Sequence, residues 1–403
     1  MKYVKKTLFK FRIIFYNIIT ALIGIVFKRD ERTILFGAWM GTKFADNSRY
    51  LFQYLSSISF EKKYKVIWAT RNYLVYKQLK TMGYNVCLCG SLSSLYWHLK
   101  AGFHIICNSS VRVGKFPADI DTKFSWGAKK IQLWHGVGFK AVGKASNSAK
   151  KQQRKILQKL PNIFSEGGWD NCFVLCTSDY DVWINKTCLN RDDDNFFVSC
   201  YPRNCECLLP TEEELNIVKK IRSFHSVILY LPTFRSSYEN YTHPLKDATF
   251  FNYLVQNNIL WIEKPHTASN FDYSSLNITN NILFLKPEFD INILYDKADL
   301  LVSDYSSSVL DGIYKRIPTI MYIPDVAIFK NGDVGFLMDI EHYFKEIIAY
   351  TIKDCIEYFE SAKQEKFFND KRKVLYNKVI QEFFSDILPS YEKVWNDILK
   401  ICH

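Results

Sequence analysis

The stretch KIQLWHGVGFKAVGK, residues 130–144, is the part of the sequence around which the fold is organised. It starts as a short apolar strand and stops at His135 and Gly136, where a glycine-broken loop begins. That loop carries Lys140 and Lys144. An imidazole and two ammonium groups beside flexible backbone are typical of a site that meets phosphate. The rest of the chain repeats the same arrangement of an apolar strand followed by polar residues.

Length and composition indicate how many domains the chain forms and what kind of partner it binds. A chain of 403 residues with 48% hydrophobic content is long enough for two domains of roughly 100–200 residues. Lys and Arg number 53 against 41 Asp and Glu, so the net charge is +12. This excess favours anionic partners: nucleic acid, an anionic membrane surface or phosphorylated substrates. The sequence has no RNP-like motif, Cys2His2 spacing or long basic tract, so we expect no nucleic-acid partner.

The eleven cysteines lie mostly in apolar, strand-like runs. An odd number scattered in this way indicates reduced, buried thiols in a cytoplasmic protein rather than a disulfide framework. The close pairs, Cys87/Cys89 and Cys205/Cys207, have C-x-C spacing and no suitably placed histidine, so we expect no zinc site.

Residues 1–29 form a separate basic and apolar segment. Five basic residues precede an apolar run of fifteen residues at 13–27, and Lys28 and Arg29 follow it. The run is shorter than the ~20 residues that span hydrocarbon, and no A-x-A-like cleavage site of a signal peptide follows. We expect a membrane-associating helix on the cytoplasmic face, where each basic residue contributes about 1 kcal/mol near anionic lipid. A helix packed on the domain itself is the alternative.

From Thr33 onward, apolar runs alternate with polar, helix-compatible segments, and the runs are apolar on both faces. This alternation predicts parallel strands covered by helices, in doubly wound Rossmann-like sheets. In the first half the predicted strands are 34–39, 64–70, 84–90, 104–110, 130–136, 171–178 and 196–202. In the second half they are 226–234, 259–266, 281–286, 300–307 and 318–323, and helices follow from 354 to 400.

The boundary between the halves falls near 203–212, where a charged amphipathic helix begins with Thr211 as its expected N-cap. The predicted domains are therefore 30–208 and 209–403. Two such sheets in tandem leave a cleft, and ligands of open sheets lie beyond the carboxyl ends of the strands.

Polar residues fall at these strand ends in the second half. They are Thr233 and Arg235, then Lys264 and His266, then Ser303, Asp304, Ser306, Ser307 and Ser308. A serine-rich helix start offers N–H groups and hydroxyls to a diphosphate. Each feature also has a simpler interpretation: the serines can be helix caps, a strand-end Arg or His can be a surface group, and Asp311 can pair with Lys315 at i+4.

Several motifs also resemble one family. WHG at 134–136, YPRN at 201–204, LPTFR at 231–235, KPH at 264–266 and SDYSSSVLDGIYKRIPTIMY at 303–322 are similar to the CDP-glycerol glycerophosphotransferases, the teichoic-acid primases and polymerases. The resemblance implies a GT-B-like fold and peripheral attachment to the membrane. It implies transfer of glycerol phosphate from CDP-glycerol to a hydroxyl of a lipid-linked or polymer acceptor, with release of CMP, in teichoic-acid or capsule-type synthesis.

Carried over by position, His135 and His266 match the family's two functional histidines, and Arg235 with Ser306–Ser308 matches its nucleotide and phosphate contacts. The chain departs from the pattern at Val137-Gly138, where Thr-Pro is usual, and at Cys200 and Cys205 around YPRN, where Gly and Asp are usual. Pro265 also precedes His266 rather than following it. A ribitol-phosphate or capsule building block would fit the departures nearly as well as glycerol phosphate.

These observations lead to a split-site hypothesis. His135, with Gly136 and Lys140, belongs to the acceptor side and acts as general base, while His266, Arg235, Thr233, Lys264 and the 303–308 segment hold the donor diphosphate. A purely structural role is the alternative for His135. We expect no resident metal, although Mg²⁺ could accompany the nucleotide. A GT-B glycosyltransferase using a nucleotide sugar and an inactive membrane-associated scaffold are the rival functions.

Overall fold

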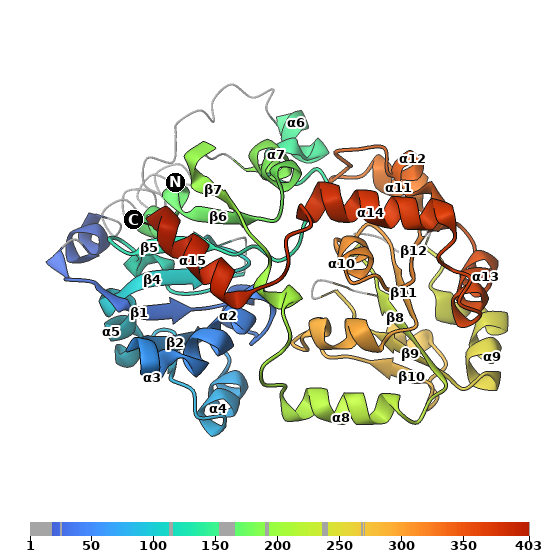
Figure 1. The fold of residues 1–403 in the computed structure, drawn as a ribbon, viewed down its shortest axis with the longest axis horizontal. Helices are drawn as coiled ribbons and strands as arrows, with labels where there is room; N and C mark the ends of the chain where they lie inside the picture. The colour runs from blue at the N-terminus through green and yellow to red at the C-terminus, as the bar shows by residue number, and fades with distance from the viewer. Residues whose placement is uncertain are drawn as a thin grey trace, which may run out of the picture.

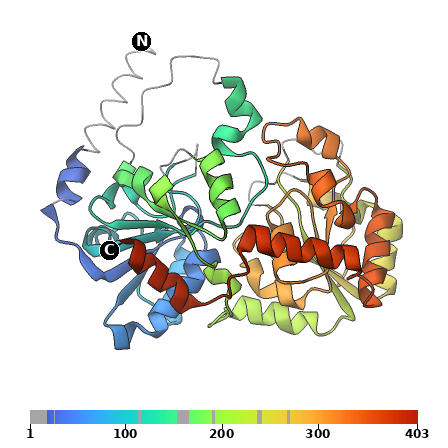
Figure 2. The same cartoon turned by 45° about the horizontal axis from the view of Figure 1, so that its top comes forward.

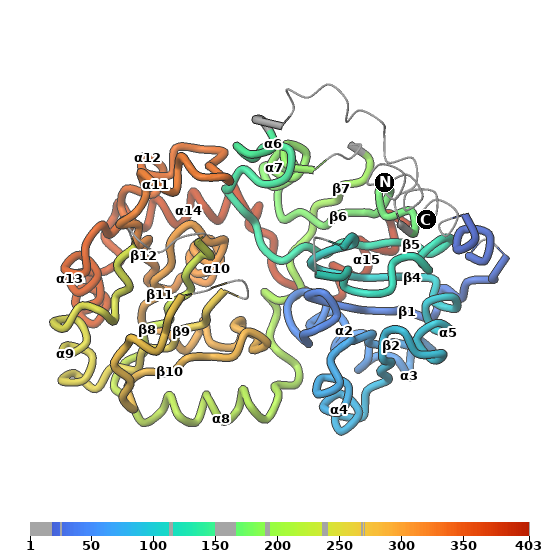
Figure 3. Tube along the Cα trace, turned by 180° about the vertical axis from the view of Figure 1, so that it is seen from behind, coloured from blue at the N-terminus to red at the C-terminus, as the bar shows by residue number. Residues whose placement is uncertain are grey.

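The protein consists of two parallel β-sheets, each wrapped by helices, that lie side by side (Figure 1). The computed structural model describes residues 18–24, 26–112, 116–152, 166–189, 193–235, 241–266, 269 and 271–402. The two lobes, blue to green and yellow to orange, are seen equally well from behind (Figure 3).

The first sheet has seven strands in the order β3-β2-β1-β4-β5-β6-β7. Its strands are β1 (Asp30–Phe36), β2 (Lys65–Thr70), β3 (Val86–Leu88), β4 (Ala101–Ile106), β5 (Lys129–Gln132), β6 (Phe173–Cys176) and β7 (Phe196–Val198). All neighbouring pairs are parallel. The seven strands predicted for the first half are therefore all present, and β5 ends just before His135.

The second sheet has six strands in the order β10-β9-β8-β11-β12-β13. Its strands are β8 (Ser226–Leu231), β9 (Ile259–Glu263), β10 (Ile282–Phe284), β11 (Leu300–Ser303), β12 (Thr319–Tyr322) and β13 (Ile348–Ala349). These pairs are parallel too. The five predicted strands are confirmed, and β13 is an additional edge strand.

Both faces of the sheets are buried, which explains why the strands are apolar throughout. In β1, Ile34 and Phe36 pack into one core cluster while Leu35 packs into a second cluster on the opposite face. In β8, Ile228 and Leu229 divide in the same way. Successive side chains of a strand point to opposite faces, so a sheet covered on both sides needs an apolar residue at every position.

The helices that cover the sheets fall where the polar segments were predicted. They are α2 (Asp46–Ser57), α3 (Ser59–Lys62), α4 (Tyr73–Thr81), α5 (Leu92–Lys100), α6 (Asn147–Gln152), α7 (Asp179–Cys188), α8 (Glu212–Ile221), α9 (Ala248–Gln256), α10 (Ser308–Tyr314), α11 (Val326–Lys330), α12 (Ile340–Tyr343), α13 (Ile352–Lys363), α14 (Asp370–Phe384) and α15 (Tyr391–Cys402). Thr211 caps α8, and Glu214 completes a capping box with it, as its sequence indicates.

The last helix does not stay with the second sheet. Figures 1 and 2 show α14 along the second lobe and α15 lying on the first. Trp395 of α15 packs against Phe103 of β4, with ring centroids 5.4 Å apart. Ser199, just after β7, donates a 2.6 Å hydrogen bond to Asp397. The chain therefore crosses between the lobes twice, once after β7 and once between α14 and α15.

The expected membrane-associating helix falls largely outside the described residues, because the basic residues of 1–17 are among those not described. Residues 18–24 are helical, and several apolar side chains there are exposed, such as Leu22 at 59%. No helix in the described part of the chain is long and apolar enough to cross a membrane. All eleven cysteines are free thiols, as predicted.

Candidate active site

A cavity of about 420 Å³ lies between the two sheets and collects most of the residues singled out by their sequence positions. His135 and Lys140 reach it from the first sheet. The second sheet contributes Thr233, Lys264, His266, Ser306, Ser307 and Ser308. These residues follow β5, β8, β9 and β11, so the carboxyl ends of four parallel strands converge on one place, as the topology requires.

His135 is held in the form that a general base needs. Its Nδ1 lies 3.1 Å from the carbonyl oxygen of Cys107. A carbonyl oxygen can only accept, so Nδ1 carries the proton and the lone pair of the neutral ring lies on Nε2. Burial lowers the pKa of His135, and this outweighs the opposing effect of Asp46. The imidazole is therefore neutral at pH 7 and able to take a proton.

The backbone before His135 is fixed in an unusual conformation. Trp134 has φ of 58°, in the left-handed region that bulky residues rarely adopt. Asn47 of α2 donates to the carbonyl oxygens of Leu133 at 3.2 Å and Trp134 at 3.0 Å. The indole of Trp134 in turn lies against the imidazole, with ring centroids 4.8 Å apart. These contacts compensate for a strained turn that directs His135 into the cavity.

Gly136 lies where the loop after β5 meets the start of α10. Its φ is 144°, and a Cβ placed there would lie 2.8 Å from the Oγ of Ser307 and 3.2 Å from the guanidinium of Arg203. A side chain at this position would push the loop after β5 away from the start of α10. The glycine is therefore needed for close approach across the cleft rather than for a contact with ligand.

Three lysines give the cavity its charge. Lys140 and Lys264 were expected, and Lys43 joins them from the segment before α2. Burial lowers the pKa of each, that of Lys43 to about 7. Partial burial and then the three ammonium groups lower the pKa of His266 to about 4. The three ammonium groups repel a further positive charge, so His266 stays neutral. A diphosphate bound among them would compensate their positive charge.

The serine segment after β11 adds hydroxyls to the same wall. The Oγ atoms of Ser306 and Ser308 are 3.0 Å apart, and the backbone N–H of Ser308 donates to Ser306 Oγ at 3.3 Å. α10 begins at Ser308 and is seven residues long. The hydrogen bonds between Ser306 and Ser308 therefore hold the hydroxyls of this segment in fixed positions.

Arg235, Ser303 and Asp304 lie behind the wall and do not line the cavity. Arg235 is 4% exposed, and its guanidinium pairs with Asp304 at 2.8 Å and Asp325 at 2.6 Å. Asp304 accepts the backbone N–H of Thr233 at 2.9 Å, and Ser303 donates to the carbonyl of Leu231 at 2.6 Å. The geometry places these residues as supports of Thr233.

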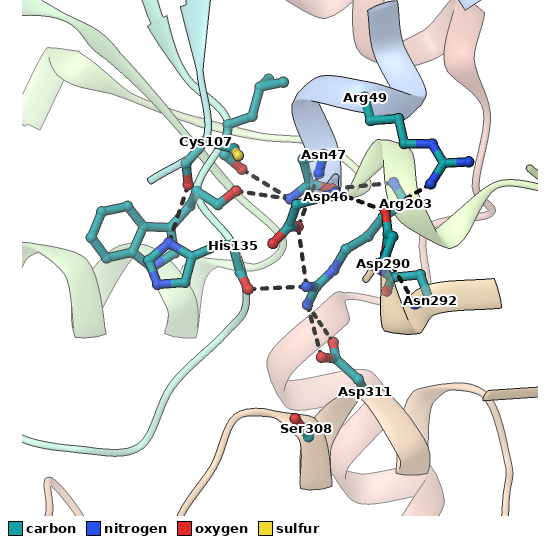
Figure 4. A network of polar contacts seen from close by, with 12 residues as sticks. Asp46, Asn47, Arg49, Cys107, His135, Arg203, Asp290, Asn292, Ser308 and Asp311 are labelled. Carbon is teal, nitrogen blue, oxygen red and sulfur yellow. Dashed lines mark hydrogen bonds and ion pairs between the residues drawn. The ribbon is translucent and has the colours of Figure 1, made fainter. Parts of the chain in front are cut away.

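Arg203 of the YPRN motif forms the centre of the site, although the motif alone did not reveal its role (Figure 4). Its guanidinium donates to Asp311 at 2.6 and 2.8 Å, to Asp46 at 3.2 Å and to the carbonyl of His135 at 3.0 Å. Asp311, considered above as a partner of Lys315 within one helix, instead binds this arginine from the other lobe. The result is a buried ionic bridge between the two sheets beside His135.

A second bridge runs through the start of α2. The backbone N–H of Asp46 donates to Asp290 at 2.9 Å, and Arg49 binds Glu214 of α8 at 2.8 Å. Lys43, Asp46 and Asn47 were not predicted as site residues. A charged segment before a helix looks like ordinary capping, and only the fold shows that this helix starts at the cavity.

Of the departures from the family pattern, Pro265 lines the cavity beside His266, whereas Val137 and Gly138 do not line it. Val137 is 1% exposed and belongs to the hydrophobic core, and a Cβ at Gly138 would meet nothing within 4 Å. Within the ranges the structure describes, no three or more His, Cys, Asp or Glu side chains gather as a metal site.

Two Rossmann-like sheets that face each other across a cleft make up a GT-B-like fold. The chain belongs to the CDP-glycerol:poly(glycerophosphate) glycerophosphotransferase family, whose model matches residues 19–399. It is thus an enzyme of the teichoic acid polyol-phosphate polymerase family.

Individual relatives are distant. The chain is 26% identical over 384 residues to a teichoic acid poly(glycerol phosphate) polymerase of Bacillus spizizenii, covering 90% of this chain and 92% of that protein. It is 26% identical over 249 residues to the teichoic acid ribitol-phosphate polymerase TarK of Staphylococcus aureus, covering 57% of this chain and 42% of that protein.

A solved structure of the wall teichoic acid polymerase TagF has the same fold. The two superpose with a TM-score of 0.66 at 17% sequence identity, over 98% of this chain and 97% of the other. The predicted family is confirmed, as is the predicted architecture of two Rossmann-like sheets with a GT-B-like arrangement.

Proposed function

We propose that the protein transfers a polyol phosphate, glycerol phosphate from CDP-glycerol in the first instance, to a hydroxyl of a membrane-linked or polymer acceptor and releases CMP. The observation that carries this proposal is the position of His135. Its Nδ1 is committed to Cys107 at 3.1 Å, and it lines the same cavity as Lys264, His266 and the serine segment. A base on one wall and a set of anion-binding groups on the other suit phosphoryl transfer, which needs alignment and charge compensation.

In the proposed reaction His135 Nε2 takes the proton of the acceptor hydroxyl. The hydroxyl oxygen forms a bond to the phosphorus that carries the polyol, and the bond from that phosphorus to the bridging oxygen breaks. The electron pair leaves with the bridging oxygen on CMP. Lys264 and the hydroxyls of Thr233 and Ser306–Ser308 hold the diphosphate oxygens, and Arg235 keeps Thr233 in place through Asp304.

The test is a donor screen with CMP release as the readout. Wild-type protein and His135→Asn are incubated with CDP-glycerol or CDP-ribitol and an acceptor that ends in a polyol phosphate. UDP-sugars serve as the comparison, because a glycosyltransferase would release UDP. Transfer from a CDP-polyol that falls at least about 10²-fold in the variant supports the proposal. UDP release alone favours the glycosyltransferase, and no turnover with any donor favours an inactive scaffold.

CDP-ribitol is the second candidate donor because both glycerol-phosphate and ribitol-phosphate polymerases are relatives at 26% identity. The ratio of kcat/KM for the two CDP-polyols decides between them.

We also infer that the protein works at the cytoplasmic membrane face. The helix at 18–24 and the residues after it expose apolar side chains, with Ile18 43%, Val26 82% and Phe27 44% exposed. Basic residues precede this segment in the sequence. Deletion of residues 1–28 should abolish sedimentation with anionic vesicles while the folded remainder stays intact. Unchanged sedimentation would contradict the inference.

Dependence on Mg²⁺ stays a separate prediction. If the ion accompanies the nucleotide, EDTA should lower turnover and added Mg²⁺ should restore it.

A further inference from the structure

Asp119, in the segment between β4 and β5, is a fully buried carboxylate that does not line the cavity. One of its carboxylate oxygens accepts the backbone N–H groups of Met40 at 2.8 Å and Ser109 at 3.1 Å. The other oxygen accepts those of Asn108 at 2.7 Å and Cys107 at 3.3 Å. Four backbone donors therefore occupy all the acceptor sites that an ionised carboxylate offers.

The two segments that Asp119 joins both contact His135. From the end of β4, the carbonyl oxygen of Cys107 lies 3.1 Å from the imidazole Nδ1 (Figure 4). From the turn after β1, the Trp39 ring lies 5.2 Å from the imidazole, centroid to centroid. Cys107 donates its own N–H to Asp119, and Met40 is next to Trp39 in the chain. One carboxylate thus fixes both the acceptor of the His135 proton and a ring beside the imidazole.

The turn after β1 is strained, and Asp119 helps to hold it. Trp39 and Met40 have φ of 45° and 59°, which non-glycine residues adopt only when their surroundings compensate. A Cβ at Gly41 would lie 3.1 Å from the carbonyl oxygen of Asp119, so this turn packs closely on the backbone of Asp119 as well.

The Asp119 carboxyl is ionised at pH 7. Burial raises its pKa to about 6, and the four backbone N–H groups oppose this increase. Both oxygens are therefore free of protons at neutral pH and can accept all four hydrogen bonds.

We propose that Asp119 is a positioning residue for the transfer reaction and acts through the Cys107 carbonyl to keep the proton of His135 on Nδ1. The inference rests on the proposed function and adds a residue that lies outside the motifs resembling the family. Asp119 takes up no proton in the reaction. If the imidazole were free to change tautomer, its proton would lie on Nε2 part of the time, and that form could not take the proton of the acceptor hydroxyl.

The first measurement is steady-state CMP release by Asp119→Asn. Asparagine has the same size, but its single oxygen has two acceptor sites and its NH2 group only donates, so it cannot accept all four N–H groups. The kcat should fall by about tenfold or more, although less than in His135→Asn. The KM for the CDP-polyol should stay within about twofold of wild type, because the donor-binding groups belong to the other sheet.

The second measurement identifies the tautomer of His135. In protein labelled with ¹⁵N at histidine, two-bond ¹H–¹⁵N correlation spectra at neutral pH distinguish a ring protonated at Nδ1 from one protonated at Nε2. The signal of His135 is the one that His135→Asn lacks. Wild-type protein should show the Nδ1–H form, and Asp119→Asn should show a mixture of the two forms. A loss of stability alone would not change this spectrum.

Asp181→Asn is the matched control. Asp181 is 1% exposed and accepts the backbone N–H of Thr177 at 3.0 Å and the side-chain amide of Asn185 at 2.9 Å. It is thus another buried carboxylate of the first lobe that holds backbone, but it follows β6 and does not line the cavity. This variant should lose stability and keep the wild-type tautomer of His135, with kcat within about twofold of wild type.

The inference is overturned if wild-type His135 carries its proton on Nε2, a result that needs no variant. It is also overturned if Asp119→Asn keeps the wild-type tautomer or has the same kcat as Asp181→Asn. If Asp119→Asn does not fold, Asp119→Glu, which keeps the charge and moves it by one methylene, is judged by the same two measurements. Absence of CMP release from any CDP-polyol would refute the proposed function instead, and the spectra would still decide whether Asp119 sets the tautomer.

Discussion

The guanidinium of Arg203 and the carboxylate of Asp311 form a two-bond ion pair, at 2.6 and 2.8 Å, that joins the two sheets beside His135. Their side chains are 5% and 6% exposed. Burial raises the pKa of Asp311, and the charge of Arg203 opposes this. The same guanidinium also donates to the carbonyl of His135, so the ion pair couples the contact between the sheets to the position of His135.

Asp311→Asn should destabilise the protein by about 3–5 kcal/mol, because it leaves the buried charge of Arg203 incompletely compensated. Thermal or denaturant unfolding measures this. CMP release should fall as well, since the loop of His135 loses a support. Glu357→Gln, in the exposed pair with Lys353, is the matched control and should stay within about 0.5 kcal/mol of wild type. Equal stability of the two variants would contradict the structural role of Asp311.

Gly136→Ala should lower turnover sharply and cost about 1–3 kcal/mol of stability, because φ of 144° and the Oγ of Ser307 at 2.8 Å exclude a Cβ. Steady-state CMP release and unfolding curves give the two quantities. Gly138→Ala serves as the comparison, since a Cβ there meets nothing within 4 Å. A Gly136→Ala variant as active as Gly138→Ala would show that the sheets do not need this close approach.

The acidic limb of the pH profile of kcat/KM should lie below the ordinary histidine value of about 6.5, because burial lowers the pKa of His135. A general base acts when deprotonated, so activity is present above this pKa and is lost as the pH falls through it. Rate measurements between pH 4.5 and 8 with a saturating acceptor test the prediction. A midpoint above about 6.5 would argue that another group is the base.

Substitution of Arg235 and substitution of Lys264 should affect different quantities, stability in the first case and the donor KM in the second. Arg235→Met removes the partner of Asp304 and Asp325, both buried, and should lower stability by several kcal/mol together with turnover. Lys264→Met should mainly raise the KM for the CDP-polyol. Donor KM and unfolding free energy, measured for both variants, separate a positioning residue from a binding residue. A stable Arg235→Met variant with only a raised donor KM would place Arg235 in direct contact with the nucleotide.

Most of the fold was predictable because strands buried on both faces leave a plain signal in the sequence. Ile34, Leu35 and Phe36 are all apolar since they serve two cores. β13 was not predictable, because two residues, Ile348 and Ala349, are too short a run to show periodicity. The docking of α15 was equally hidden, because helical periodicity marks an apolar face and does not say which surface receives it.

The site was predicted to a different degree on its two walls. His135, Lys264, His266 and the serine segment follow strands, and strand ends meet by topology. Lys43 and Arg203 were not predicted as site residues because neither follows a strand. Lys43 reaches the cavity from the segment before α2, and Arg203 reaches it from a 3-10 turn. The two carboxylates that Arg203 binds, Asp46 and Asp311, are 157 and 108 residues away in the sequence. One chain without its fold carries no sign of such pairs.

The return of α15 to the first lobe also sets an order on how the chain folds during synthesis. Trp395 is 4% exposed and fills the surface beside Phe103, and its indole N–H meets the hydroxyl of Tyr64 at 3.2 Å. The first lobe is synthesised long before residue 395 leaves the ribosome. Until then this aromatic surface faces solvent, so the lobe that is made first is completed last. Its final stability therefore depends on the second lobe having been synthesised.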